Sequence, residues 1–237
     1  MKAKLVGTET KYLELELSPN EDFFAEKGSM VNCDNNIKFE VLRQNNIIKS
    51  KLSGESMFIC RWFNPSNNFG KLCIVGQYKS LLPIKIQSYD DLIVRCGEYV
   101  ASTKRVDIIS SSSMKKTICG VGLIFQKIIG EGTIFVDDSG NTQVKQLAEG
   151  EEILVDEQHV LGFLNIDNSK IKSIRKSKNF LAGEGFSIMS VTGPGTIFIS
   201  STPLSSSEQR SPVGCLIALF FLMAYFAIVF IISYYRS

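Results

Sequence analysis

The chain has 237 residues, with 26 lysines and arginines against 24 aspartates and glutamates, one histidine and six cysteines. This length fits one or two domains with a buried core, and 44% hydrophobic with 21% charged residues excludes a disordered or collagen-like chain. A formal net charge of +2 argues against a dedicated nucleic-acid-binding protein, which usually concentrates basic residues on one face. A single histidine also excludes every multi-histidine metal site.

The first predicted strand is LELEL (13–17), in which apolar and acidic residues alternate as in a strand with one solvated face. Further short β-branched or aromatic segments follow, bounded by turn-forming residues: IVGQY (74–78), GTIFVDD (132–138) and GTIFIS (195–200). No window before the C-terminal apolar segment shows a persuasive helical period of 3.6 residues. The sequence therefore predicts an all-β body.

Three similar units follow one another along this body. Each starts with an acid pair and two apolar residues (21–24, 90–93 and 151–154), so the starts are offset by 69 and 61 residues. A glycine turn that opens a strand follows 33, 30 and 32 residues after the respective acid pairs. This self-similarity predicts a triplicated, β-sandwich-like domain over residues 1–201. Its units span about 1–80, 81–148 and 149–201, packed around a pseudo-threefold axis.

Glycines mark the predicted turns of these units. A phosphate-binding loop needs a helix immediately after the glycines, whereas strands follow here, so we interpret the glycines as turn residues with positive φ. The closing turn of the first unit is displaced by the insertion Asn64-Pro65-Ser66-Asn67-Asn68. The predicted structural turns comprise Gly54, Gly120, Gly130, Gly132, Gly183, Gly185, Gly193, Pro194 and Gly195.

Arg61-Trp62-Phe63 lies beside this insertion and places two large rings near an irregular loop. Trp and Arg are enriched in the hot spots of protein interfaces, so these three residues are a candidate interaction patch. The alternative is simple strand alternation, which would bury one ring and partly expose the other.

Five cysteines lie in the body, and four of them sit within or beside apolar runs. Neighbouring cysteines are at least 13 residues apart, so no CxxC motif of a zinc knuckle or thioredoxin-like protein is present. Free cysteines in such positions behave as small buried hydrophobes, which agrees with a reducing compartment.

His159 is the one side chain suited to acid–base work near neutral pH. Its counterparts in the repeat are Ser29 and Glu98, which favours a turn or cap, and no serine or cysteine has the context of a nucleophile elbow. The acid pairs are interpreted as solvated strand starts, with a cation-binding ring of carboxylates as the alternative. We therefore predict no enzyme activity, no catalytic residues, no cofactor and no metal.

The segment 213–235 contains 23 residues without a single charge. As a helix it would be about 34 Å long, enough to cross a hydrocarbon core of about 30 Å. A Ser/Pro-rich linker (202–212) precedes it, and the N-terminus lacks the apolar stretch of a secretory signal. The sequence therefore predicts a single-pass, tail-anchored membrane protein whose N-terminal domain lies in the cytosol.

Motifs spread over residues 1–201 carry a family resemblance: EKGSMV (26–31), GESMF (54–58), VDEQHVLGF (155–163), GEGF (183–186) and TGPGTIFISS (192–201). Together they resemble the altered-inheritance-of-mitochondria protein 24 family, with Gln158 in place of its usual glycine. The resemblance implies a β-rich fold, similar to that of the tryptophan RNA-binding attenuation protein, repeated three times. Eukaryotic members of that family are mitochondrial and are linked to inner-membrane organisation, whereas bacterial members have no agreed activity. The resemblance therefore implies a role in membrane organisation and no particular reaction.

These observations predict a non-enzymatic protein that presents a β-rich scaffold domain at a membrane, with a role in membrane organisation implied by the resemblance. A small-ligand-binding sensor, with a pocket between units, is the alternative function. The expected partners are the membrane, through the C-terminal helix, and a protein that the sequence does not identify. Self-association is compatible with this reading, and a nucleic-acid partner is not expected.

Overall fold

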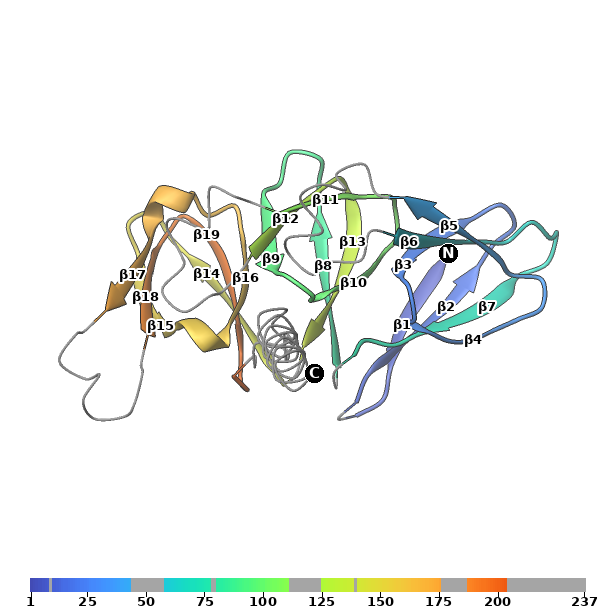
Figure 1. Ribbon diagram of the computed structural model, residues 1–237, viewed down its shortest axis with the longest axis horizontal. Coiled ribbons are helices and arrows are strands. Elements are labelled where there is room, and N and C mark those ends of the chain that lie inside the picture. The colour runs from blue at the N-terminus through green and yellow to red at the C-terminus, as the bar shows by residue number, and fades with distance from the viewer. Residues whose placement is uncertain are drawn as a thin grey trace, which may run out of the picture. The chain divides into compact units, whose positions relative to one another are not determined.

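The predicted all-β body is confirmed by the computed structural model, which describes residues 1–8, 10–43, 58–77, 80–110, 125–138, 140–175 and 187–203 (Figure 1). The regular elements in these ranges are β-strands and two short 3₁₀ turns. Residues Met1–Leu204 form one compact unit.

The strands fall into three groups in chain order. The first contains β1 (Lys2–Val6), β2 (Tyr12–Leu17), β3 (Asp22–Glu26), β4 (Met30–Cys33), β5 (Lys38–Arg43), β6 (Phe58–Phe63) and β7 (Gly70–Ile74). The second contains β8 (Ser80–Ile86), β9 (Leu92–Arg95), β10 (Tyr99–Ser102), β11 (Asp107–Ser110), β12 (Phe125–Ile129) and β13 (Gly132–Asp138). The third contains β14 (Thr142–Leu147), β15 (Glu152–Asp156), η1 (Glu157–His159), β16 (Val160–Leu164), η2 (Asn168–Lys170), β17 (Ile171–Arg175), β18 (Ser187–Thr192) and β19 (Gly195–Ser200).

One pairing scheme occurs in all three groups. In the first group β7 lies between β2 and β4 and β6 lies between β3 and β5; β13 and β12 take these places in the second group, and β19 and β18 in the third. Every one of these pairs is antiparallel. Each group therefore contributes two three-stranded half-sheets, with β1 added to the first of them.

Half-sheets of neighbouring groups join edge to edge into six-stranded sheets. The first junction pairs β10 with β3, and the second junction pairs β16 with β9, both antiparallel. The resulting orders are β5-β6-β3-β10-β13-β8 and β11-β12-β9-β16-β19-β14. The groups are thus linked by backbone hydrogen bonds as well as by side-chain packing.

The predicted arrangement around a pseudo-threefold axis is not reproduced by the strand pairing. A closed ring of three groups would need β15 to pair with β4, in the manner of the two junctions. Instead β4 ends the sheet β1-β2-β7-β4, and β15 ends the sheet β15-β18-β17. The series of sheets formed by the described residues is therefore open.

Alternating side chains build three cores between the sheets. In β2, Leu13, Leu15 and Leu17 point inward while Glu14 and Glu16 face outward, as the alternation predicted. The first core includes Leu13, Leu15, Phe23, Ala25 and Trp62; the second includes Phe24, Leu92, Tyr99, Ile108 and Ile134; the third includes Ile93, Phe125, Phe163, Ile171 and Met189.

Strand β3 explains how one strand serves two cores. Its neighbours Phe23 and Phe24 point to opposite faces, so Phe23 packs in the first core and Phe24 in the second. Ile93 of β9 likewise packs in the third core while Leu92 packs in the second. A continuous apolar run is required where both faces of a strand are buried in this way.

The predicted strands GTIFVDD and GTIFIS coincide with β13 and β19, and LELEL lies within β2. The strand predicted at 74–78 is wrong for residues 75–77, because β7 ends at Ile74, the residue that pairs with Leu13 near the start of β2. The next amide, of Val75, donates to the carbonyl of Ser29 instead of continuing the ladder.

Some of the glycines assigned to turns have positive φ. Gly130, Gly132 and Gly195 have φ values of +148°, +118° and +141°, a region that L-residues rarely adopt. Gly193 is not among the positive-φ glycines; a Cβ there would clash with the carbonyl oxygen of Ala148, so close approach explains this glycine. Gly54, Gly120, Gly183 and Gly185 lie outside the described residues, as do 204–212 of the linker and the apolar segment 213–235. None of the helical turns described within 1–203 is long and apolar enough to cross a membrane.

Candidate functional site

The candidate patch Arg61-Trp62-Phe63 lies in β6, and strand alternation divides its side chains between two environments. Trp62 is 5% exposed and belongs to the first core. Its ring stacks at a tilt on Phe39, with 5.1 Å between the centroids, and its buried Nε1 has no hydrogen-bond partner. The indole is therefore a core group, covered on one side by a side chain of β5.

Arg61 is held by partners within its own sheet. Its guanidinium donates two hydrogen bonds to Asp22, at 3.0 and 2.9 Å, and one to Glu40 at 2.8 Å. It also lies 5.1 Å from the ring centroid of Phe63. The hydrogen bonds that Arg61 donates to Glu40 and then to Asp22 raise the pKa of its guanidinium. An interaction role for this patch stays a prediction, and its accessible part is Arg61 and Phe63, not Trp62.

The acid pairs cap the turns that precede β3, β9 and β15. The first acid of each pair accepts a hydrogen bond from the backbone amide three residues earlier: Ser18 to Glu21 at 2.7 Å, Gln87 to Asp90 at 2.7 Å and Ala148 to Glu151 at 3.0 Å. This is the same local device at the start of all three groups. The repeated acids in the sequence therefore have a structural cause.

The second acid of each pair is bound within its own half-sheet. Asp22 pairs with Arg61 at 2.8 Å, Asp91 pairs with Lys127 at 3.0 Å, and Glu152 accepts a hydrogen bond from Ser190. No group of three or more His, Cys, Asp or Glu side chains within the described ranges is placed to hold a metal ion. The ring of carboxylates considered from the sequence is not assembled by these residues.

His159 closes η1, the short turn between β15 and β16. Its Nδ1 donates to the carbonyl oxygen of Ser200, 2.8 Å away, and Asp156 caps the turn by accepting from the Gln158 amide at 2.9 Å. The buried Glu157 in the same turn accepts a hydrogen bond from Ser173. The imidazole thus fastens a turn to the last strand, which is the kind of role expected from its place in the repeat.

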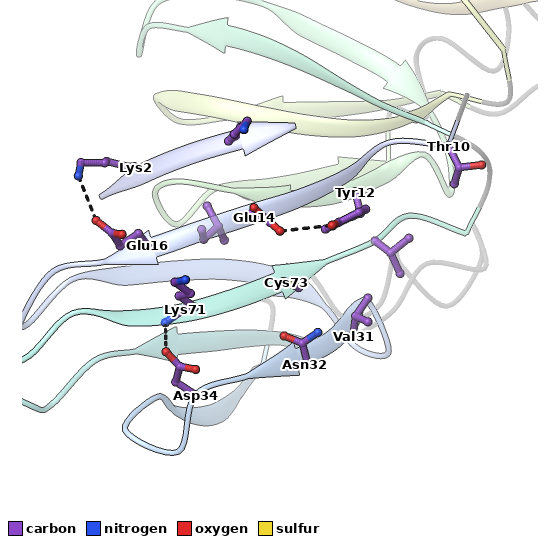
Figure 2. A pocket seen from close by; sticks show the side chains of 13 residues that line it. Lys2, Thr10, Tyr12, Glu14, Glu16, Val31, Asn32, Asp34, Lys71 and Cys73 are labelled. Carbon is purple, nitrogen blue, oxygen red and sulfur yellow. Dashed lines mark hydrogen bonds and ion pairs between the residues drawn. The ribbon is translucent and has the colours of Figure 1, made fainter. Parts of the chain in front are cut away.

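The outward face of the sheet β1-β2-β7-β4 forms an open hollow of about 780 Å³ that the sequence did not single out (Figure 2). Lysines and glutamates alternate across it, with Lys2 bound to Glu16 at 3.1 Å and Tyr12 to Glu14 at 3.2 Å. The hollow is lined by Lys2, Lys4, Thr10, Tyr12, Glu14, Leu15, Glu16, Val31, Asn32, Asp34, Lys71, Cys73 and Val75. The alternation of LELEL was the available signal, because it marks this face as solvated.

Cys73 lies in this hollow on β7 (Figure 2). Burial, followed by the negative charge of Glu14, raises the pKa of its thiol, so the group is protonated at neutral pH. Cys33, Cys60, Cys73 and Cys96 are all free thiols, and Cys60 is buried in the first core, in line with the sequence analysis.

Large apolar side chains are exposed where sheets end. On the edge strands β4 and β5 these are Val31, at 55%, and Phe39, at 59%, together with Val41. On the edge strand β15 it is Leu154, at 60%. Exposed apolar groups on unpaired strand edges are a recognised hazard for association, so they mark candidate contact surfaces.

The fold and the sequence were compared with those of known proteins. A crystal structure of a Streptococcus pyogenes protein superimposes with a TM-score of 0.63 over 92% of this chain and 99% of that one, at 20% sequence identity. At that identity the likeness establishes the fold alone. No curated protein sequence gives a match. A family profile described as mitochondrial biogenesis AIM24 matches residues 3–202, so the chain belongs to this family, as its motifs indicated.

Proposed function

We propose that the protein is a non-enzymatic, tail-anchored membrane protein that presents its β-rich body as an interaction scaffold, with the body in the cytosol. The 23-residue uncharged run at 213–235 supports the anchor. Membership of a family described as mitochondrial biogenesis AIM24 is compatible with a role in the organisation of a membrane.

The observation that carries the scaffold role is the set of exposed apolar side chains on free strand edges. Val31 and Phe39 come from two different sheets of the first group, and each stands on the strand that ends its sheet. An unpaired edge offers backbone donors and acceptors in a row, and the apolar side chains beside it supply the area that a partner would bury.

We also propose that the body arose from three copies of one unit. The support lies in two local devices that recur at matching places: the acid cap before β3, β9 and β15, and a β-bulge near the start of β4, β10 and β16. Cap and bulge are independent details of the backbone, so their joint recurrence favours triplication over a chance likeness of strands.

Photo-crosslinking in native membranes tests the scaffold role. A benzoylphenylalanine at Phe39 of the full-length protein should give a reproducible crosslinked species, identified by mass spectrometry. The same probe at Tyr89, which is exposed on a turn rather than on a sheet edge, is the control and should give none. An equal pattern from both positions, or no product from Phe39, would refute a specific surface at this edge.

A small-ligand sensor is the second candidate, and the hollow on the sheet β1-β2-β7-β4 is what favours it. Its lysines and glutamates would suit a polar, zwitterionic ligand. A ligand bound only by the folded state would raise the melting temperature. A library of metabolites should contain one that raises the melting temperature of the wild-type protein but not of Lys71→Ala; absence of any such compound would remove this candidate.

A further inference from the structure

The two junctions between strand groups share one register. At the first junction Ala101 of β10 lies opposite Ala25 of β3, and Ser102 lies opposite Phe24. At the second junction Gly162 of β16 lies opposite Val94 of β9, and Phe163 lies opposite Ile93. In both cases the incoming strand carries a β-bulge directly before the first paired residue. The junction is therefore a defined interface that the chain forms twice.

Two edges that stay unpaired among the described residues, on β4 and β15, carry the two halves of the same interface. Strand β4 has its bulge between Met30 and Asn32, so Asn32 and Cys33 occupy the positions of Ala101 and Ser102. Strand β15 follows its acid cap as β3 and β9 do. The positions of Phe24 and Ala25 are thus taken by Leu154 and Val155.

Comparison of equivalent positions shows that the apolar side chains on these two edges lack the neighbouring group that buries their counterparts. Val31 is exposed, whereas its counterparts Val100 and Leu161 are buried in the cores of the preceding groups. Leu154 is exposed as well, although its counterparts at the junctions, Phe24 and Ile93, are buried in the cores of the following groups.

Phe39 of β5 fits the same scheme. Its counterparts are Ile108 of β11 and Ile171 of β17, which face the equivalent residues of the neighbouring strands. Ile108 shares the second core with Phe24, and Ile171 shares the third core with Ile93. Each of these cores is thus completed by a side chain from the preceding group. The first core has no preceding group, which leaves Phe39 exposed.

We propose that β15 of one copy pairs antiparallel with β4 of a second copy, with Asn32 opposite Val155 and Cys33 opposite Leu154. This third junction repeats the register of the other two. It would bury Val31 in one copy's third core and both Leu154 and Phe39 in the other copy's first core. It deepens the proposed function, on which it rests, by naming a second copy of this chain as the partner of that surface. Because the contact is head-to-tail, each added copy leaves one β4 and one β15 free.

Disulfide trapping tests the register. Directly opposed residues of antiparallel strands have Cα atoms about 4.5–5.5 Å apart, which is within the range that a disulfide can span. Leu154→Cys in the full-length protein should therefore form a disulfide with the native Cys33 on mild oxidation, giving dimers and higher species on a non-reducing gel. Adding Cys33→Ser should abolish these species, and Glu152→Cys, two residues out of register, should not produce them.

A mixture of two variants assigns the disulfide to separate copies. One copy carries Leu154→Cys with Cys33→Ser, and the other is the wild-type chain bearing an affinity tag of different mass. A mixed disulfide between them is the expected result. A disulfide formed only within the single Leu154→Cys chain would overturn the proposal in favour of closure inside one molecule, since Cys33 would then meet Leu154→Cys of its own chain.

The remaining outcomes are also decisive. If no disulfide to Cys33 forms while the variant melts at the wild-type temperature, β4 and β15 do not meet, and the second copy is excluded as the partner of this surface. Crosslinking from Phe39 to a different protein would then leave the scaffold role standing without self-association. Loss of both signals would refute the scaffold role as well.

Discussion

Asn64 is a fully buried polar residue that organises the segment between β6 and β7. Its Nδ2 donates to the carbonyls of Leu17, at 2.9 Å, and Asn68, at 2.7 Å. Its Oδ1 accepts from the amide and hydroxyl of Ser66, at 3.1 and 2.7 Å. The inserted residues that lengthen this connection are thus fastened to β2 by one amide side chain.

Replacing Asn64 with alanine should therefore lower the free energy of unfolding, because the segment between β6 and β7 depends on its amide group. The change removes the side-chain donor of the buried hydrogen bond to the Leu17 carbonyl, and losing one partner of a buried hydrogen bond typically costs about 1–3 kcal/mol. Chemical denaturation should show a loss of this size for Asn64→Ala. Asn67→Ala, at an exposed position in the same segment, should change stability little. Equal losses for both variants would contradict the role assigned to Asn64.

Asp90 links the second and third strand groups through a side chain that is charged at neutral pH. It accepts a hydrogen bond from the Asn165 side chain at 2.9 Å and another from the Gln87 amide, and these bonds lower the pKa of Asp90. A lowered folded-state pKa contributes stability that is present above the unfolded pKa, about 3.9, and is lost as the pH falls through the folded value.

Asp90→Asn should therefore reduce stability at pH 7, and its difference from the wild type should shrink below about pH 4, where the unfolded carboxyl protonates. Urea titrations across pH 2.5–7 measure this. Asn165→Gly, which tolerates the positive φ of 58° at this position, removes the same bond, so the double variant should lose less than the sum of the two single variants. A pH-independent difference would exclude the ionised form as the relevant one.

At the level of single residues, the sequence predicted the surroundings of a side chain better than the direction in which the side chain points. The acid pairs were recognisable from their spacing, and their capping role follows from turn chemistry that is local in the chain. The orientation of Trp62 was not predictable, because adjacent aromatics satisfy a strand pattern with either one pointing inward. Only the register of β6 against β3 and β5 decides it, and those pairs join residues 39 and 23 apart in sequence.

At the scale of elements, the second junction depends on close backbone approach at Gly162. A Cβ at this position would clash with the carbonyl oxygen of Ile93 and lie 3.1 Å from the Cα of Val94. The first junction carries Ala101 here, opposite the small Ala25, whereas Gly162 faces the bulkier Val94. The size of one residue on β16 is thus matched to its neighbour on β9.

Gly162→Ala should push β16 away from β9 and lower stability by about 1–3 kcal/mol, the usual range for overpacking. Thermal and urea unfolding measure the loss. Asn32→Ala, at the equivalent position of the edge strand β4, is the control and should leave the unfolding of a dilute sample nearly unchanged. A Gly162→Ala protein as stable as the wild type would show that this junction adapts without cost.

Strands themselves were predictable, but their edges were not. GTIFVDD and GTIFIS had the composition and boundaries of strands, and they are β13 and β19. Which strands stay unpaired depends on contacts between residues in different units, such as Ala101 with Ala25, and no local pattern encodes them. The sequence pattern therefore predicts burial of Val31 and Leu154, because their counterparts in the other groups are core residues.

For the whole molecule, the buried side chains that the structure describes in the three cores all come from residues 13–198. Removing residues 204–237 should therefore leave the melting temperature unchanged within about 2 °C, a shift that corresponds to about 0.5–1 kcal/mol for a chain of this length.

The same deletion tests the anchor. The full-length protein should float with membranes and resist alkaline extraction, whereas the chain ending at residue 203 should stay in the soluble fraction. Exchanging three leucines of the apolar segment for arginines in the full-length protein is a milder variant, since charged residues at the centre of a membrane helix are costly. Membrane association that survives both changes would refute the anchor at 213–235.

The junction between β3 and β10 also has a consequence for synthesis. The edge of β3 cannot be covered until β10, roughly 75 residues later, has left the ribosome, and the edge of β9 stays open in the same way until β16 follows. At about 5–20 residues per second, each strand edge stays open for several seconds. During that time it can pair with any suitable strand on a neighbouring nascent chain. Slow translation between the groups would thus favour exchange of units between chains made on one polysome.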